Sequence, residues 1–361
     1  MEKILIINDV SGIGGTEKAL ASLVKLIKNN YYLKIITIFG TKDEEKNFGS
    51  HSSYLINKKF IPFFENHSSL DFLRKLFLKQ YFHYLHKYDI VISFKEGECQ
   101  IYAQCVKAKK HISWVQTNVI QYPWTEYLYR SKEEETNIYH KFDKIITVSK
   151  KCAEDLKTKF SISDDKVEII PNIIDYDYID FCCKEKLILK DDCIKFISVS
   201  RLDKIKNVFE TVKIFKEISE KYDQLRFQYF IIGNGFEYDA IHEYIVNNNL
   251  QDIIQLLGEK DNPYNYMSEC DILIHNSSSE SFGLVFVEAL YLGLNIISTN
   301  CGIISEIYDA FPDRIDVVET REQILNSITK HIENHLVKKE KIKFIDNNEI
   351  VKQICNLFRL D

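Results

Sequence analysis

Short runs of β-branched and other apolar residues alternate along the chain with longer stretches whose apolar positions recur at helical spacing. In the first half, Glu17–Asn29 has this helical period, and the short runs predict strands at Ile4–Asn8, Leu33–Phe39, Asp89–Phe94, His111–Val115 and Lys144–Val148. Strands that alternate with helices are typical of a parallel sheet covered by helices on both faces.

The same alternation begins again in the second half. Strands are predicted at Ile194–Ser200, Arg226–Gly233, Asp271–His275, Leu294–Ser298 and Arg314–Val318, and helices at Val208–Glu220, Glu237–Asn248, Leu284–Leu292 and Arg321–Glu333. The pattern predicts two α/β, Rossmann-like doubly wound domains, 1–182 and 183–344, with the junction in Asp175–Leu189. Such domains bind ligands at the carboxyl ends of their strands, so a cleft between the two is the expected site.

The last segment, 345–361, has an apolar stripe at Ile350, Ile354, Leu357 and Phe358. This stripe predicts a helix that packs on another part of the chain. We expect that part to be the first domain.

Composition narrows the classes of protein that fit. The 361 residues carry a net charge of −6 with a pI near 6.0, which does not suggest a nucleic-acid partner. The opening MEKILIINDV lacks the pattern of a signal peptide, and no run of apolar residues is long enough to span a bilayer. The nine cysteines form no CxxC pair and are expected to be reduced thiols, which favours a cytoplasmic protein.

The segment NSSSESFGLVFVEAL contains two carboxylates, Glu280 and Glu288, on either side of a predicted helix start at Gly283. The unpaired amides of a helix N-terminus bind anions, and a glycine there lets the ligand approach closely. Carboxylates beside an anion site suit hydroxyl groups, such as those of a sugar or a ribose. The combination suggests a nucleotide-sugar.

Two cations, Arg201 and Lys206, follow a predicted strand end in SVSRLDKIKN. They could hold a diphosphate and stabilise the charge on a leaving phosphate. A solvated basic loop is the alternative for this segment.

Glycines follow two other predicted strands. Gly14 and Gly15, in SGIGGTEKA, and Gly233, in IIGNG, allow the backbone to approach a ligand, although tight turns between strands and helices require glycine as well. A dinucleotide fingerprint does not fit the first loop. Gly12 and Gly14 match the first two glycines of G-x-G-x-x-G, but Glu17 occupies the third glycine position.

Taken together, GGTEK, VSRLDKIKN, IIGNG, SESFGLVFVEAL and CGIISEI resemble, in order and spacing, the motifs of a retaining glycosyltransferase of family four with the GT-B fold, glycosyl transferases group 1. The resemblance spans residues 12 to 306. It implies two domains that face each other across a cleft, the first binding the acceptor and the second the nucleotide-sugar.

The resemblance also implies a role for each matching residue. Glu280 would contact the donor sugar and Glu288 the ribose, while Arg201 and Lys206 would neutralise the leaving diphosphate. The remaining donor contacts would come from the amides of Phe282, Gly283 and Leu284, from Gly14, Gly15 and Gly233, and from the base-binding region at Leu257–Gly258.

One position departs from the family pattern. The strand HISWVQT ends in Gln116, where the family often has a histidine near the donor sugar. Glutamine forms hydrogen bonds but is not an acid or base near neutral pH, so the sequence leaves the identity of a general base open. Glu96, in SFKEGE, is a candidate acceptor contact, and a solvated loop carboxylate is the alternative.

We expect no cofactor and no metal. The acidic pairs Asp164–Asp165 and Asp191–Asp192 resemble turn or linker residues rather than a metal motif. The expected mechanism is departure of the nucleoside diphosphate, followed by attack of an acceptor hydroxyl on the same face of the sugar. Retention of configuration is implied by the resemblance.

The segment Phe72–Lys87 contains four basic residues among aromatic ones and no acidic residue. Such a helix could rest on anionic lipid at the inner face of the plasma membrane, in keeping with the lipid-linked acceptors of the family. An amphipathic core helix with a solvated basic face is the alternative.

The leading hypothesis is transfer of a sugar, from a UDP-sugar by family preference, to a glycan or lipid-linked acceptor in surface polysaccharide synthesis. The alternatives are a GT-B-fold nucleotide-sugar epimerase and a non-catalytic nucleotide-sugar-binding protein. Glu280, Arg201 and Lys206 together argue against the last.

Overall fold

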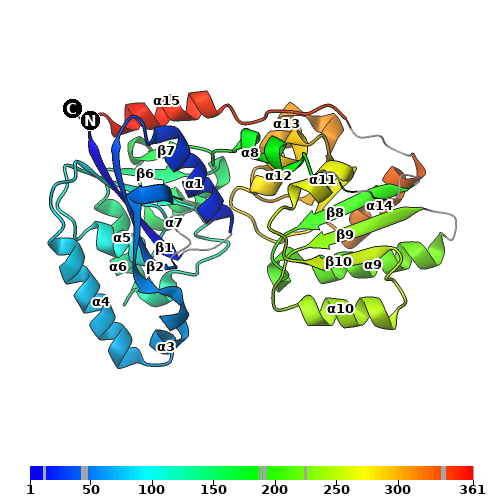
Figure 1. The fold of residues 1–361 in the computed structure, drawn as a ribbon, viewed down its shortest axis with the longest axis horizontal. Helices are drawn as coiled ribbons and strands as arrows, with labels where there is room; N and C mark the ends of the chain where they lie inside the picture. Colours follow the sequence, from blue (N-terminus) through cyan, green and yellow to red (C-terminus); the bar gives the residue numbers. More distant parts are fainter. Residues whose placement is uncertain are drawn as a thin grey trace. The chain divides into compact units, whose positions relative to one another are not determined.

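The computed structural model describes residues 1–10, 14–41, 48–185, 187, 189, 193–222, 226–334 and 339–360. The chain divides into two compact units, one made of Met1–Ile173 with Asp346–Asp361 and the other of Ile174–Ile345. Figure 1 shows the helices and strands of each unit.

The first unit is built on a 7-stranded sheet in the order β3-β2-β1-β4-β5-β6-β7. Its strands are β1 (Lys3–Val10), β2 (Tyr32–Gly40), β3 (Ser52–Asn57), β4 (Ile90–Ser93), β5 (Lys110–Val115), β6 (Lys144–Thr147) and β7 (Val167–Ile169). Its helices are α1 (Gly15–Ile27), α3 (Ile61–Glu65), α4 (Ser68–His83), α5 (Glu98–Ala103), α6 (Lys132–His140), α7 (Lys150–Phe160) and α15 (Asn347–Phe358).

The second unit is built on a 6-stranded sheet in the order β10-β9-β8-β11-β12-β13. Its strands are β8 (Ile194–Val199), β9 (Phe227–Ile232), β10 (Ile254–Gly258), β11 (Ile272–His275), β12 (Asn295–Thr299) and β13 (Ile315–Val318). Its helices are α8 (Tyr176–Cys182), α9 (Val208–Lys221), α10 (Tyr238–Asn247), α11 (Tyr264–Glu269), α12 (Leu284–Tyr291), α13 (Ile304–Ala310) and α14 (Arg321–Glu333).

The central strands are buried because their apolar runs face helices on both sides of each sheet. All strand pairings between described residues are parallel. In β9 every residue of FQYFII is buried, and Phe215 of α9 stacks on Tyr229 of that strand with ring centroids 4.4 Å apart. The two doubly wound α/β units predicted from the sequence are therefore present.

Each sheet has a point at which the order of its strands reverses. In the first unit this point lies between β1 and β4, and in the second it lies between β8 and β11. Ligands of doubly wound folds bind beyond the carboxyl ends of the strands at this point. The loops after these four strands are therefore the places to look for a site.

The final helix α15 packs on the first unit, where it is drawn in red in Figure 1. The ring of Phe358 lies 5.5 Å from that of Tyr31, and Lys110 Nζ donates a 2.7 Å hydrogen bond to the carbonyl of Leu357. The four residues of the apolar stripe, Ile350, Ile354, Leu357 and Phe358, are all buried.

The division of the chain falls earlier than the sequence pattern places it. The pattern ends the first domain at residue 182, whereas the structure assigns α8 to the second unit. The physical reason is side-chain packing. Tyr176 of α8 lies 4.5 Å from Tyr291 of α12 by ring centroids, and Asp180 accepts a hydrogen bond from the Tyr291 hydroxyl.

Several other features bear on the sequence-based expectations. The cysteines are all free thiols. No helix among the described residues combines the length and apolar character that a membrane crossing requires. Within the same residues, no three His, Cys, Asp or Glu side chains are grouped in a way that could hold a metal ion. Asp164 and Asp165 begin a single helical turn, whereas Asp191 and Asp192 lie outside the described residues.

Candidate functional site

Three loops meet at the carboxyl edge of the second sheet, and the loop after β11 lies between the other two. Its Ser278 amide donates to the carbonyl of Ile205, after β8, at 2.8 Å. On its other side, its Glu280 and Phe282 carbonyls accept bonds of 3.2 and 3.0 Å from the amides of Gly302 and Ile303, after β12. This backbone framework fixes the position of Glu280.

Glu280 and Lys206, which are 74 residues apart in the sequence, form an ion pair at this edge. Their side chains are 22% and 13% exposed, so the pair lies at the border between protein and solvent. His275, the last residue of β11, places its Nε2 3.4 Å from the same Glu280 oxygen, Oε2.

The charges in this cluster keep Glu280 ionised. Burial by itself raises the pKa of Glu280, but the adjacent His275 ring and the Lys206 ammonium outweigh it and bring the pKa down to about 2. At neutral pH Glu280 is therefore a carboxylate. In that form it accepts hydrogen bonds from hydroxyl groups but does not donate a proton.

Arg201, the other predicted cation, differs from Lys206. Its side chain is 72% exposed and lies 3.5 Å from Asp203. Asp203 caps the turn that carries Lys206, because its side chain accepts from the Lys206 amide at 3.2 Å. After β8 the structure thus has one largely buried cation, Lys206, paired with Glu280, and one exposed cation, Arg201.

Gly283 makes the turn that starts α12. Its φ of +83° lies in the left-handed region, and a Cβ at this position would meet the Phe286 ring at 2.4 Å. Phe282 is buried and Leu284 begins the helix. The amides of the first turn of a helix have no partners within the helix, so this turn presents donors beside Glu280.

Glu288 lies inside α12 and is buried. Its Oε1 accepts a 2.7 Å hydrogen bond from the hydroxyl of Tyr264, the first residue of α11. One carboxylate oxygen is therefore occupied within the protein.

The glycine loop after β9 brings three strand ends close together. The Gly233 amide donates to the Gly258 carbonyl at 2.9 Å, and a Cβ on Gly233 would meet the carbonyl oxygen of Ser200 at 1.8 Å. Leu202, after β8, donates its amide to Asn234 at 2.9 Å. The close approach of these backbones requires glycine at position 233 whether or not a ligand binds. Gly258 ends β10 at the same edge.

In the first unit, Glu96 lies after β4 and is only 1% exposed. One carboxylate oxygen, Oε2, accepts a 3.0 Å hydrogen bond from the backbone amide of Gln116. The other, Oε1, accepts hydrogen bonds from the Trp124 indole at 2.9 Å and from the Thr117 hydroxyl. The alternative of a solvated loop carboxylate is therefore wrong, because Glu96 organises the loop that follows β5.

Gln116 directly follows β5 and is also buried. Its Oε1 accepts a 3.4 Å bond from Asn172, and its Nε2 has no hydrogen-bond partner among the described residues. The free N–H groups suit a ligand oxygen, whereas an amide provides no base.

Gly14 and Gly15 stand at the start of α1, and Gly12 lies outside the described residues. A Cβ on Gly14 would meet the Glu17 carboxylate at 2.7 Å, and burial raises the pKa of Glu17. The position of that carboxylate, beside the loop, agrees with the argument against a dinucleotide pyrophosphate here.

The sequence analysis missed three polar residues at these edges. His275 was hidden by its place at the end of a buried strand. Lys95 follows β4, and Asp9 is the second-last residue of β1. Their charged atoms are 3.3 Å apart, and the Lys95 ammonium lies 4.7 Å from the Trp124 ring. The signal for Lys95 and Asp9 is that both stand where the strand order reverses.

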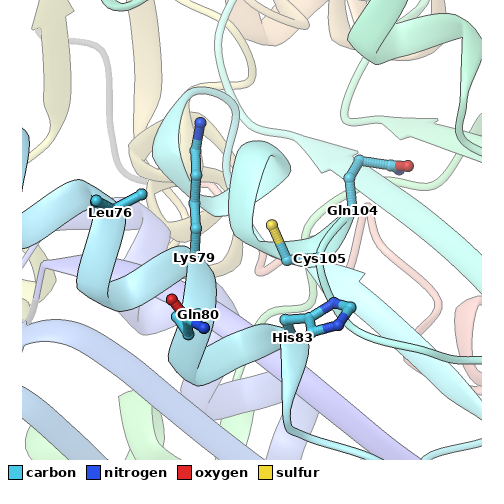
Figure 2. Close-up of a pocket in the computed structure, with 6 residues that line it drawn as sticks. All are labelled: Leu76, Lys79, Gln80, His83, Gln104 and Cys105. Carbon is cyan, nitrogen blue, oxygen red and sulfur yellow. The ribbon is translucent and has the colours of Figure 1, made fainter.

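A shallow pocket of about 400 Å³ lies elsewhere in the first unit. Figure 2 shows its lining, which comes from α4 and from the two residues that follow α5: Leu76, Lys79, Gln80, His83, Gln104 and Cys105. None of the residues predicted to bind the donor contributes to it.

The chain is similar to known proteins along most of its length. A family model described as Glycosyltransferase Family 4 matches residues 13–178, and one described as Glycosyl transferases group 1 matches residues 183–349. The first match lies mainly on the first unit and the second mainly on the second unit.

Among the curated relatives that match part of the chain are one bacterial and one yeast protein. An N-acetylgalactosamine-N,N'-diacetylbacillosaminyl-diphospho-undecaprenol 4-alpha-N-acetylgalactosaminyltransferase of Campylobacter jejuni is 34% identical over 163 residues, or 45% of this chain and 43% of that protein. The phosphatidylinositol N-acetylglucosaminyltransferase GPI3 subunit of Saccharomyces cerevisiae is 24% identical over 229 residues, or 60% of this chain and 50% of that subunit. The chain thus spans about half the length of the curated relatives it matches.

The fold is also that of solved glycosyltransferase structures. HepE of Anabaena, crystallised with UDP and glucose, matches with a TM-score of 0.77 at 16% identity over 99% of each chain. A likeness at this identity shows the fold, which is GT-B. Because the two family models together run from residue 13 to residue 349, the chain belongs to the family 4, group 1 glycosyltransferases.

Proposed function

We propose that this protein is a retaining glycosyltransferase that moves a sugar from a UDP-sugar to a glycan or lipid-linked acceptor in cell-surface polysaccharide synthesis. The observation that carries the proposal is the pairing of Glu280 with Lys206 beside the Gly283 turn, at the reversal point of the second sheet. A carboxylate for sugar hydroxyls, a cation for phosphate and free helix amides are the groups that a nucleotide-sugar requires.

In this proposal each part of the site contacts a different part of the donor. Glu280 accepts hydrogen bonds from the donor sugar, and Glu288 uses the oxygen not bonded to Tyr264 for the ribose. Lys206, Arg201 and the amides of the Gly283 turn stabilise the negative charge that builds on the diphosphate as the bond to the anomeric carbon breaks.

The acceptor oxygen then bonds to the anomeric carbon on the face from which the diphosphate leaves. The hydroxyl must lose its proton in this step, and the Gln116 amide does not accept it. On that face the departing phosphate oxygen lies next to the incoming hydroxyl, so it is the group that takes the proton. Gln116 instead donates to a sugar or phosphate oxygen.

The donor nucleotide and sugar can be identified by thermal shift against a panel of nucleotide-sugars, because a ligand that binds only the folded state raises its apparent stability. Turnover is then measured as nucleoside diphosphate released with acceptor present. We expect Glu280→Gln and Lys206→Ala each to lower kcat/KM by at least 10-fold, which is the scale of one lost charged hydrogen bond. Unchanged turnover in both variants would show that the site is assigned wrongly.

The same assay separates the proposal from a GT-B-fold epimerase. A transferase releases nucleoside diphosphate in proportion to the acceptor consumed, and it forms a glycosylated product. An epimerase changes the sugar of the nucleotide-sugar without an acceptor. Turnover that persists in a metal chelator would support the proposal that no metal is required, and loss of turnover restored by Mg²⁺ would contradict it.

We further propose that the protein works at the cytoplasmic face of a membrane, with contact through Phe72–Lys87. The free cysteines favour a reducing compartment. Phe72 and Phe77 of α4 are 63% and 70% exposed, and Lys79 and Lys87 are exposed in the same segment. Aromatic side chains with nearby lysines suit an anionic lipid surface.

Arg74 is one of the four basic residues of this segment that the sequence suggests as lipid contacts, but the structure does not leave it at the surface. It is buried, and it binds both oxygens of Glu98 at 2.9 and 2.7 Å as well as Asp71. Arg74 therefore holds α4 against α5 and is not available to lipid.

A further inference from the structure

His275 is a buried residue that the proposed mechanism leaves without a role. Its side chain is 6% exposed at the end of β11, and its Nε2 has no hydrogen-bond partner among the described residues. The carboxylate oxygen Oε2 of Glu280 lies 3.4 Å from that nitrogen. A buried polar group without a partner is uncommon in proteins and calls for an explanation.

The ring of His275 is held in place by α12. It meets the Phe286 ring edge-on, with centroids 4.8 Å apart and an interplanar angle of 80°. Phe286 in turn packs over Gly283, where a side chain would collide with it. The Gly283 turn, whose amides are proposed to bind the ligand, therefore also fixes the His275 imidazole next to Glu280.

The Lys206 ammonium has two competing anionic partners in the proposed function, Glu280 and the diphosphate. In the structure its ammonium is paired with Glu280. In the proposed function it faces the diphosphate as negative charge develops there. Whenever Lys206 turns to the phosphate, Glu280 loses its main cation while remaining largely buried, and a buried carboxylate without a partner is unstable.

We propose that His275 is a positioning residue for Glu280, whose Nε2–H bonds the carboxylate when Lys206 turns to the diphosphate. This inference rests on the proposed function. His275 then keeps Glu280 directed at the sugar hydroxyls throughout the reaction. It touches neither the donor nor the reacting atoms, and it acts through Glu280.

The first test is a crystal structure of the Lys206→Ala variant, which removes the competing cation. We expect the distance from His275 Nε2 to Glu280 Oε2 to shorten from 3.4 Å to a hydrogen bond of about 2.8–3.0 Å. A Glu280 side chain that turns away from the imidazole would overturn the proposal. This result does not depend on knowing the reaction.

The second test compares His275→Gln, which keeps an N–H donor, with His275→Leu, which has none. We expect His275→Leu to lower kcat for the nucleotide-sugar by about 10- to 100-fold, the scale of a hydrogen bond to a charged group, while the affinity for UDP alone stays within about 3-fold. His275→Gln should recover most of the lost rate. Equal losses in both variants, or equal loss of UDP affinity, would indicate a merely structural role.

His331 supplies the matched control. It is a buried histidine of the same unit, 2.9 Å from the carboxylate of Asp316, and Asp316 is not among the predicted donor contacts. His331→Leu should lower stability without changing kcat. If the wild-type protein turned over no nucleotide-sugar, the proposed function would fail, and the Lys206→Ala structure would still decide whether His275 takes over Glu280.

Discussion

The hydroxyl of Tyr264 donates a 2.7 Å hydrogen bond to Oε1 of the buried Glu288 carboxylate. The bond links α11 to α12 at a distance of 24 residues along the chain. Burial and then the Glu288 charge raise the pKa of Tyr264 far above its ordinary range, so the hydroxyl stays protonated and remains a donor. The carboxylate proposed to hold the ribose is thereby fixed in orientation before a ligand arrives.

We expect Tyr264→Phe to weaken donor binding more than the chemical step. The change leaves a buried Glu288 oxygen without its donor, which costs about 1–3 kcal/mol of stability and frees the side chain to rotate. KM for the nucleotide-sugar should rise about 10-fold with a smaller change in kcat. Steady-state kinetics and thermal unfolding measure the two effects.

Tyr229→Phe is the control for this change. Tyr229 is a buried tyrosine of the same unit, in β9, whose hydroxyl donates to Ser198 at 2.8 Å. Its loss should lower stability and leave KM unchanged. If Tyr264→Phe behaved in the same way, Glu288 would not be the ribose contact.

The contribution of Glu280 to the free energy of unfolding should decrease as the pH falls. Its pKa is about 2 in the folded protein against an ordinary value of 4.5. Because the folded value is the lower one, the stabilisation is fully present above pH 4.5 and is lost as the pH falls towards 2. The shift corresponds to up to about 3 kcal/mol.

The test compares unfolding of the wild type with that of Glu280→Gln between pH 7 and pH 2. The variant should be less stable at neutral pH, and the difference should shrink as the pH falls below about 4.5. Other carboxylates titrate equally in both proteins, so the difference isolates Glu280. A difference that stays constant over this range would contradict the assigned charge cluster.

The central strands of both sheets are predictable because a strand buried on both faces is a continuous apolar run. The strands β3, β7 and β10 escape prediction for a physical reason. Ser52–Asn57 is half-buried with polar ends, Val167–Ile169 has three residues, and only the first residue of Ile254–Gly258 is fully buried. None of them shows the continuous apolar run of a central strand.

The candidate site was predictable only in part. Strand ends place Lys206 and Glu280 at one edge of a sheet, and the motif resemblance supplies their roles. Glu96 bonds Trp124, and Arg74 bonds Glu98, through loops and helices that come together only in the folded chain. The pattern of apolar positions in the sequence does not indicate which of these segments will be neighbours. His275 is missed for the same reason, since a histidine that ends a buried strand is indistinguishable in sequence from a core residue.

Gly283→Ala should disrupt the start of α12. The substitution combines a φ of +83° with a Cβ that would lie 2.4 Å from the Phe286 ring, and we expect a loss of about 2–4 kcal/mol. Because the same turn presents the amides proposed to bind phosphate, affinity for UDP should fall at least 10-fold. Unfolding and isothermal titration with UDP measure these effects.

Gly49→Ala separates backbone strain from collision. Gly49 has a similar φ of +66°, and a Cβ there would meet nothing within 4 Å. Its substitution should cost about 1–2 kcal/mol and leave UDP affinity unchanged. Equal effects of the two alanine variants on UDP affinity would show that the Gly283 turn does not bind phosphate.

The proposed membrane contact predicts that removing exposed aromatic side chains of α4 abolishes lipid binding. Phe72→Ser with Phe77→Ser removes two side chains that are 63% and 70% exposed, so the fold should tolerate the change. Flotation with vesicles containing anionic lipid should show binding of the wild type that weakens with salt, and loss of binding in the variant.

Phe236→Ser is the control, because Phe236 is a fully exposed phenylalanine of the second unit, at 102%. Equal binding of all three proteins would exclude α4 as the lipid contact, and so would failure of the wild type to float with anionic vesicles.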